Sequence, residues 1–194
     1  MADRLYLSYW IRGYSGQTML RHFEKLLRKF PFSPNSPAPV ELRIYVQQFS
    51  EPPLIERVFD RLTKDLDDVI AASREFENAD SGYIVEGYWD LWRYDPEWKL
   101  TPAPVSLACY GPLFENDLGD HLRIEFGNDA DFLPQPETPG SSRKVESNIR
   151  GLLRLVHELD DTLPTENRRL WSESGENFAD RLAEALSEHP RAGS

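Results

Sequence analysis

The chain has 194 residues, 40% of them hydrophobic and 12% aromatic, which is enough to bury the core of one globular domain. Its 33 acidic and 22 basic residues give a net charge of -11, which disfavours nucleic acid and membrane surfaces as partners, because both attract clustered Lys and Arg. Cys109 is the only cysteine, so no intrachain disulfide can form. With no signal-peptide pattern and no apolar run long enough to span a membrane, the sequence predicts a cytoplasmic protein.

Two strands and one helix are predicted in the first fifty residues. Alternating hydrophobic residues indicate a strand over 4–12 and a second one over 40–49. Apolar residues at helical spacing predict a helix between them, over 19–30, and the proline-rich segment 31–39 is expected to be a loop.

A second helix is expected after residue 50. Ser50, followed by prolines at 52 and 53, is typical of a helix start, because proline is tolerated in the first turn. An apolar stripe then continues at helical spacing from Ile55 to Phe76.

Three more strands are predicted before residue 130. The segment 82–95 is typical of a strand with large residues on both faces, and a hairpin partner follows from Trp98 to about 107–109. Pro102 and Pro104 in that partner cannot donate ladder hydrogen bonds, which predicts a bulge or an edge strand. The last strand is predicted over 121–127.

The C-terminal part is expected to be helical. A proline-rich loop over 132–142 precedes a third helix, marked by apolar residues from Val145 to Leu159. A fourth helix is predicted to begin at Ser174 and end at Pro190, which gives a helical part over about 143–188.

The element order β-α-β-α-β-β-β, followed by two helices, predicts a single α+β domain over 1–194 with one mixed β-sheet. Its sheet-containing part covers about 3–130. Right-handed crossovers place the first two helices on one face of the sheet. The two C-terminal helices either extend that layer or cover the opposite face.

The face opposite the first two helices combines aromatic rings with charged groups. Along 82–95, alternation places three aromatic and two acidic residues on a side where a solvated strand carries plain polar residues. We expect this face to bind a ligand or partner. The residues expected to bind are Trp10, Arg12, Arg43, Tyr45, Tyr88, Asp90, Trp92 and Arg123.

Three interpretations of this face are open. In the first, the C-terminal helices cover the rings, and Arg43, Glu86, Arg123 and Glu125 form cross-strand ion pairs. In the second, the face is an interface, either with a protein partner or with a second copy in a homo-oligomer. In the third, it binds a small polar ligand.

The sequence contains no complete catalytic motif, which favours a non-catalytic binding protein. Its acidic character favours a cationic protein partner, as expected for an acidic inhibitor or immunity-type protein. The alternative is a hydrolase or transferase acting on a polar or anionic small molecule, with Arg43 and Arg123 holding an anionic group. The candidate catalytic residues for that alternative are Glu86, Glu125 and His121.

No metal or cofactor is expected. None of the 4 histidines is spaced with a cysteine or another histidine as a metal pair. The acidic segments 117–120 and 128–131 lack the spacing of a calcium loop and are typical of turns.

Overall fold

The computed structural model describes residues 3–36, 38–60, 62–135 and 137–173. Within these ranges the chain forms seven strands, three α-helices and one short 3-10 helix. The strands are β1 (Arg4–Ile11), β2 (Val40–Val46), β3 (Ile55–Phe59), β4 (Ser81–Tyr94), β5 (Trp98–Tyr110), β6 (Leu122–Asn128) and β7 (Thr165–Ser172). The helices are α1 (Met19–Lys29), α2 (Leu62–Glu75), the 3-10 helix η1 (Asp129–Phe132) and α3 (Ser141–Thr162).

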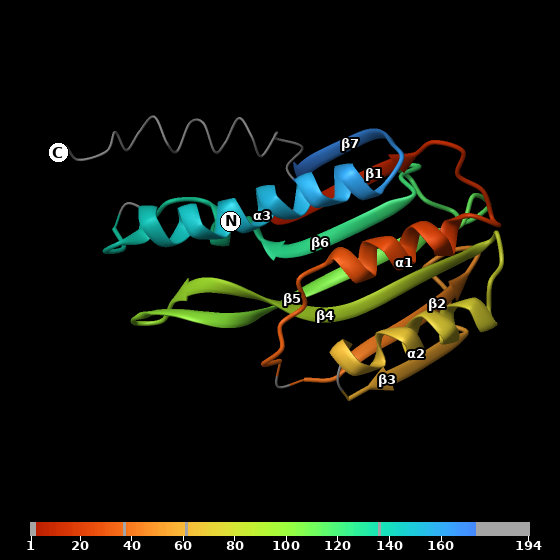
Figure 1. The fold of residues 1–194 in the computed structure, drawn as a ribbon, viewed down its shortest axis with the longest axis horizontal. Coiled ribbons are helices and arrows are strands. Elements are labelled where there is room, and N and C mark those ends of the chain that lie inside the picture. The colour runs from red at the N-terminus through yellow and green to blue at the C-terminus, as the bar shows by residue number, and fades with distance from the viewer. Residues whose placement is uncertain (1–2, 37, 61, 136, 174–194) are drawn as a thin grey trace.

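The strands form one sheet in the order β3-β2-β4-β5-β6-β1-β7, and every neighbouring pair is antiparallel (Figure 1). The prediction of an α+β fold with one sheet is therefore confirmed, whereas the prediction of a mixed sheet is wrong. Strands β1 and β2, which α1 connects, do run in the same direction. However, β6, β5 and β4 lie between them, so they form no parallel pair.

Strand β3 replaces the first part of the predicted second helix. Ile55, Val58 and Phe59 are spaced like one face of a helix, so local periodicity does not distinguish the two structures. The structure pairs the whole segment with β2, from Ile44↔Ile55 to Val40↔Phe59. Branched and aromatic residues favour a strand where such a neighbour exists, and α2 begins only at Leu62.

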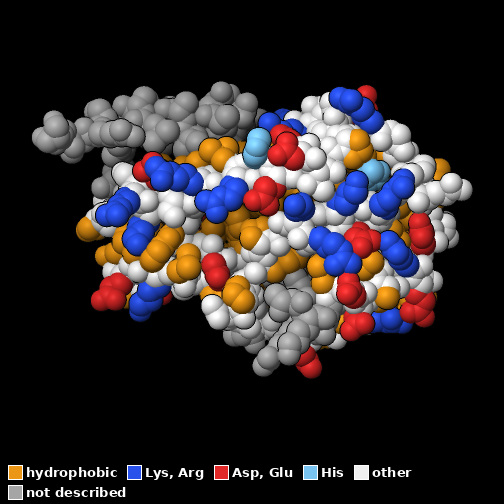
Figure 2. All heavy atoms as spheres, viewed as in Figure 1, with side chains coloured by type: hydrophobic (Ala, Val, Ile, Leu, Met, Phe, Trp, Pro, Cys, Tyr) orange, Lys and Arg blue, Asp and Glu red, His pale blue; other side chains and the backbone are white. Residues whose placement is uncertain are grey.

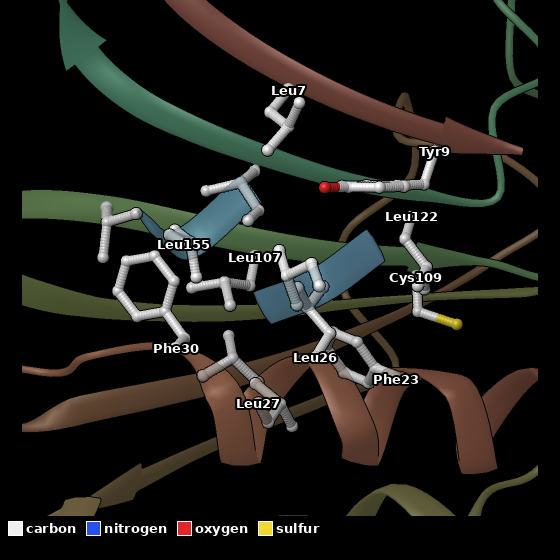
Figure 3. Close-up of a cluster of buried hydrophobic side chains, with 14 of the residues drawn as sticks. Leu7, Tyr9, Phe23, Leu26, Leu27, Phe30, Leu107, Cys109, Leu122 and Leu155 are labelled. Carbon is white, nitrogen blue, oxygen red and sulfur yellow. The ribbon is translucent and has the colours of Figure 1, made fainter. Parts of the chain in front are cut away.

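All three helices cover the same face of the sheet, with α1 in contact with both α2 and α3 (Figure 1). The hydrophobic core lies between the two layers (Figure 3). Its members include Leu7, Tyr9, Leu107, Cys109 and Leu122 from the sheet, Phe23, Leu26 and Leu27 from α1, and Leu155 from α3. Among the described residues, no helix is long and apolar enough to cross a membrane.

The C-terminal part differs from its prediction. The third helix is confirmed as α3, but Pro164 follows its end and the chain returns to the sheet as β7. Strand β7 pairs with β1 from Ile11↔Thr165 to Leu5↔Ser172. Since α3 joins the other helices, it does not cover the opposite face. The predicted fourth helix lies outside the described residues.

The β4–β5 hairpin extends beyond the rest of the sheet (Figure 1). Strand β2 pairs with β4 only up to Glu86, whereas the hairpin continues to Tyr94↔Trp98. We call its projecting part, residues 88–104, the arm. Strand β5 lies between β4 and β6 and pairs with β4 without a register shift, so neither the predicted edge strand nor the bulge is confirmed. Pro102 and Pro104 lie in the arm, where β5 has no β6 neighbour and their missing donors cost no ladder bond on that side.

We expect Trp171→Ala to destabilise the protein by about 2–3 kcal/mol, because it removes a ring stacked on Tyr6 and leaves the buried hydroxyl of Ser8 without its indole donor. Urea unfolding measures the change. The control, Leu153→Ala on the exposed side of α3, should stay within about 0.5 kcal/mol of the parent. Equal effects of the two substitutions would contradict the placement of β7.

Candidate functional site

The sheet side turned away from the helices, which we call the open face, carries a row of three glutamates and one serine. Glu41, Glu86, Ser106 and Glu125 lie next to one another in register on β2, β4, β5 and β6. We call them the acidic row. Neighbouring strands lie ~4.8 Å apart, so the backbones of Glu86 and Glu125 stand about 10 Å from each other across Ser106.

The acidic row lines a pocket of about 410 Å³, which we call the acidic pocket. Tyr88 and Pro104, the next register pair on the same face of the hairpin, also line it. The acidic pocket therefore combines carboxylates from three strands with one aromatic ring.

Arginines hold the carboxylates of the acidic row in place. Arg43 donates hydrogen bonds to Glu41 at 2.7 Å and to Glu86 at 3.3 Å. Arg4 donates to Glu125 at 2.8 Å, and this charge raises the pKa of Arg4. A hydrogen bond with Glu41 raises the pKa of Glu56, as expected when two carboxylates of like charge adjoin. The two arginines therefore leave an excess of negative charge.

Of the cross-strand ion pairs expected among Arg43, Glu86, Arg123 and Glu125, the pair between Arg43 and Glu86 forms. Arg123 pairs with neither glutamate. Arg123 donates instead to the buried carboxylate of Asp120 at 2.6 Å and lies over the ring of Tyr110, 5.1 Å from its centroid. Desolvation lowers the pKa of Arg123, but the Asp120 hydrogen bond helps to raise it overall. Arg123 is thus part of the internal structure of the open face.

Tyr45 belongs to a separate cluster of aromatic residues at one end of the open face. Tyr45 packs against Phe49 with a centroid distance of 4.9 Å, and Phe49 packs against Phe114 at 4.8 Å. Phe114 and Tyr110 are buried in the same small cluster. Tyr45 therefore contributes to a local hydrophobic cluster formed by loops at this end of the sheet.

The predicted binding residues do not gather in one place. Tyr88 joins Glu86 and Glu125 at the acidic pocket, and Arg43 contacts two of its carboxylates. Trp10 pairs with Asn167 of β7, and Arg12 lines a separate polar depression. Asp90 and Trp92 lie in the arm, beside a second pocket.

His121 lies outside the acidic pocket, although alternation placed it on the same face as Glu125. Its ring stacks on Tyr14 with a centroid distance of 4.0 Å, and its Nδ1 accepts a hydrogen bond from the Ile11 amide at 2.8 Å. The Tyr14 hydroxyl also contacts Cys109, whose burial raises the pKa of the thiol to about 12. His121, Tyr14 and Cys109 therefore form a cluster that holds the structure together.

The second pocket, of about 460 Å³, lies between the arm, the segment after α1 and α3; we call it the arm pocket. Figure 2 shows the helix side of the molecule, where hydrophobic surface is exposed between basic and acidic side chains. The buried apolar walls of the arm pocket are Trp89, Leu91 and Leu155. Gly151 and Arg154 of α3 border the pocket. Only Asp90 and Trp92 of its lining were expected from the sequence.

Asn148 of α3 fixes the edge of the arm at this pocket. The Trp92 amide donates to its Oδ1 at 2.9 Å, and its Nδ2 donates to the carbonyls of Trp92 and Asp131 at 2.9 and 2.8 Å. An Asn within the apolar stripe of a helix is the signal that could have pointed to this role, because Asn is unfavourable there without a specific partner.

Comparisons with protein-family models, curated proteins and solved structures give no match for this chain. The function must therefore be argued from the geometry of the two pockets.

We expect His121→Asn to reduce the loss of stability in mild acid. Burial lowers the pKa of His121 in the folded protein. In the unfolded chain a histidine has a pKa of ~6.5, so the unfolded chain binds a proton at higher pH than the folded protein does. The free energy of unfolding therefore decreases as the pH falls below ~6.5. Asn keeps an acceptor for the Ile11 amide but does not titrate. Urea unfolding between pH 7.5 and 5 should show a shallower decline than in the parent. An identical pH dependence would contradict this role of His121.

Proposed function

We propose that this protein is a non-catalytic binding protein whose acidic pocket receives a cationic side chain of a protein partner. The observation that carries the proposal is the convergence of Glu41, Glu86 and Glu125 on one pocket beside Tyr88. A guanidinium or ammonium group gains charge-assisted hydrogen bonds from such carboxylates and a favourable contact with an aromatic ring.

The local charge supports a cationic partner. Around the acidic pocket, five carboxylates of the described residues interact with two arginines, Arg4 and Arg43. The five are those of Glu41, Glu56, Glu86, Glu125 and Glu173. The net charge of -11 on the whole chain would also steer a basic partner toward the protein. Self-association through this face is less favourable, because a two-fold contact would bring two acidic rows together.

A catalytic role is less well supported by the same geometry. Glu86 and Glu125 line one pocket, but each carboxylate is held by an arginine, and His121 is engaged elsewhere. The acidic pocket therefore offers a fixed pattern of acceptors for recognition.

We expect an acetylated and amidated Arg-Gly-Arg peptide to bind at the acidic pocket and to shift the amide resonances of Ser106 and Gly127 in a ¹⁵N titration. Glu86→Gln combined with Glu125→Gln should weaken binding about tenfold, since charged hydrogen bonds are lost. A peptide with citrulline in place of arginine keeps the shape without the charge and should not bind.

The matched control combines Glu137→Gln with Glu146→Gln, which removes the same charge from exposed positions outside the acidic pocket. An equal loss of affinity in the control would mean that net charge alone attracts the peptide. Binding of the citrulline peptide with the same affinity would also refute the proposal.

A further inference from the structure

The arm pocket has the walls of a small-molecule site. Trp89, Leu91 and Leu155 are only 3%, 2% and 3% exposed, and together with Phe32 and Trp92 they form an apolar interior. Its volume of about 460 Å³ lies within the range typical of ligand pockets.

Four residues on one side of α3 border the arm pocket without filling it. Ser147, Gly151, Arg154 and Glu158 follow one another at helical spacing and all line the pocket. Glycine is unfavourable inside a helix. A Cβ atom at position 151 would meet no atom of the described residues within 4 Å. Packing therefore does not require Gly151, and its effect is to keep room on the α3 side of the pocket.

The polar groups of the arm pocket that lack partners are mainly donors. The indole Nε1 of Trp89 is buried without a hydrogen-bond partner among the described residues. Lys29 and Arg154 form no ion pair within the described part of the chain. Lys and Arg side chains only donate hydrogen bonds, so Lys29 and Arg154 at the rim favour a ligand that brings an acceptor.

The acidic groups of the pocket limit the charge of that ligand. The Asp90 carboxylate already accepts a hydrogen bond from Ser33 Oγ at 2.7 Å. Glu158 lies one turn beyond Arg154 and would repel a second negative charge on a bound molecule. These groups favour a monoanion over a dicarboxylate or a phosphate ester.

We propose that the arm pocket binds a small monocarboxylate with an apolar, arylalkanoate-like body. The body packs on Trp89, Leu91 and Leu155, and the carboxylate lies toward Arg154 and Lys29 at the rim. This site is separate from the acidic pocket, so it is tested independently of the cationic partner.

The test uses 3-phenylpropanoate as the probe in a ¹⁵N titration. We expect saturable shifts of the Trp89 indole resonance and the Gly151 amide. The neutral amide, 3-phenylpropanamide, should bind about tenfold more weakly, because it lacks the charge that Arg154 and Lys29 recognise. The amine, 3-phenylpropylamine, should not bind. Equal affinity for the amine would overturn the proposal.

Two substitutions on α3 locate the site. Gly151→Phe should abolish binding by filling the pocket, whereas the matched variant Gly151→Ala should keep it, because a methyl group fits the open space. Arg154→Gln, at an exposed position where folding is not at risk, should weaken binding of 3-phenylpropanoate about tenfold. Unchanged affinity in Arg154→Gln, or in a folded Gly151→Phe, would refute the proposal.

Discussion

The attachment of the arm to the rest of the fold rests on the side-chain amide of Asn148. Beyond Glu86, the described residues give the β4 edge no further strand and only the isolated bridge between Trp89 and Phe32. A long unpaired edge is costly when buried and prone to association when exposed. Asn148 is 4% exposed, and its amide gives the Trp92 backbone both an acceptor and a donor, as a strand would. One residue of α3 thereby attaches the arm to the helical layer.

Other contacts reinforce this attachment. Arg93 donates to both oxygens of Asp131, Lys144 lies 3.2 Å from the centroid of the Trp92 ring, and the Trp98 indole donates to the Pro139 carbonyl at 2.7 Å. At the root of the arm, the Ser33 amide donates to the Tyr88 carbonyl at 2.7 Å. The arm pocket lies between the Ser33 and Asn148 contacts, and the acidic pocket lies at the root on the open face. Both proposed sites thus depend on a hairpin that is longer than its sheet.

Much of the fold follows from local patterns in the sequence. Alternation predicts β1, β2, β4, β5 and β6, and helical periodicity predicts α1 and α3, because each of these elements turns one apolar side to the core. Strand β3 shares its spacing with a helix, and β7 carries polar and charged residues over 166–169 that show no apolar alternation. Both are defined by their pairing with a distant strand, which local periodicity does not report.

The sites were less predictable than the fold. Alternation brought Glu86, Tyr88 and Glu125 to one face, and the register places them at one pocket. It could not show that Asp120, in a loop, engages Arg123. The arm pocket forms where α3 packs against a projecting hairpin. The roles of Gly151 and Asn148 depend on this tertiary packing, so local sequence patterns could not predict them.

Hydrogen exchange in Asn148→Leu tests the central role of this amide most directly. Leucine keeps the volume but leaves the Trp92 backbone groups unsatisfied. We predict that the Trp92 amide and its neighbours in the arm exchange about tenfold faster or more, with a smaller change at Leu107 and Ile124 in the sheet. Equal acceleration throughout the sheet, or none in the arm, would contradict the account.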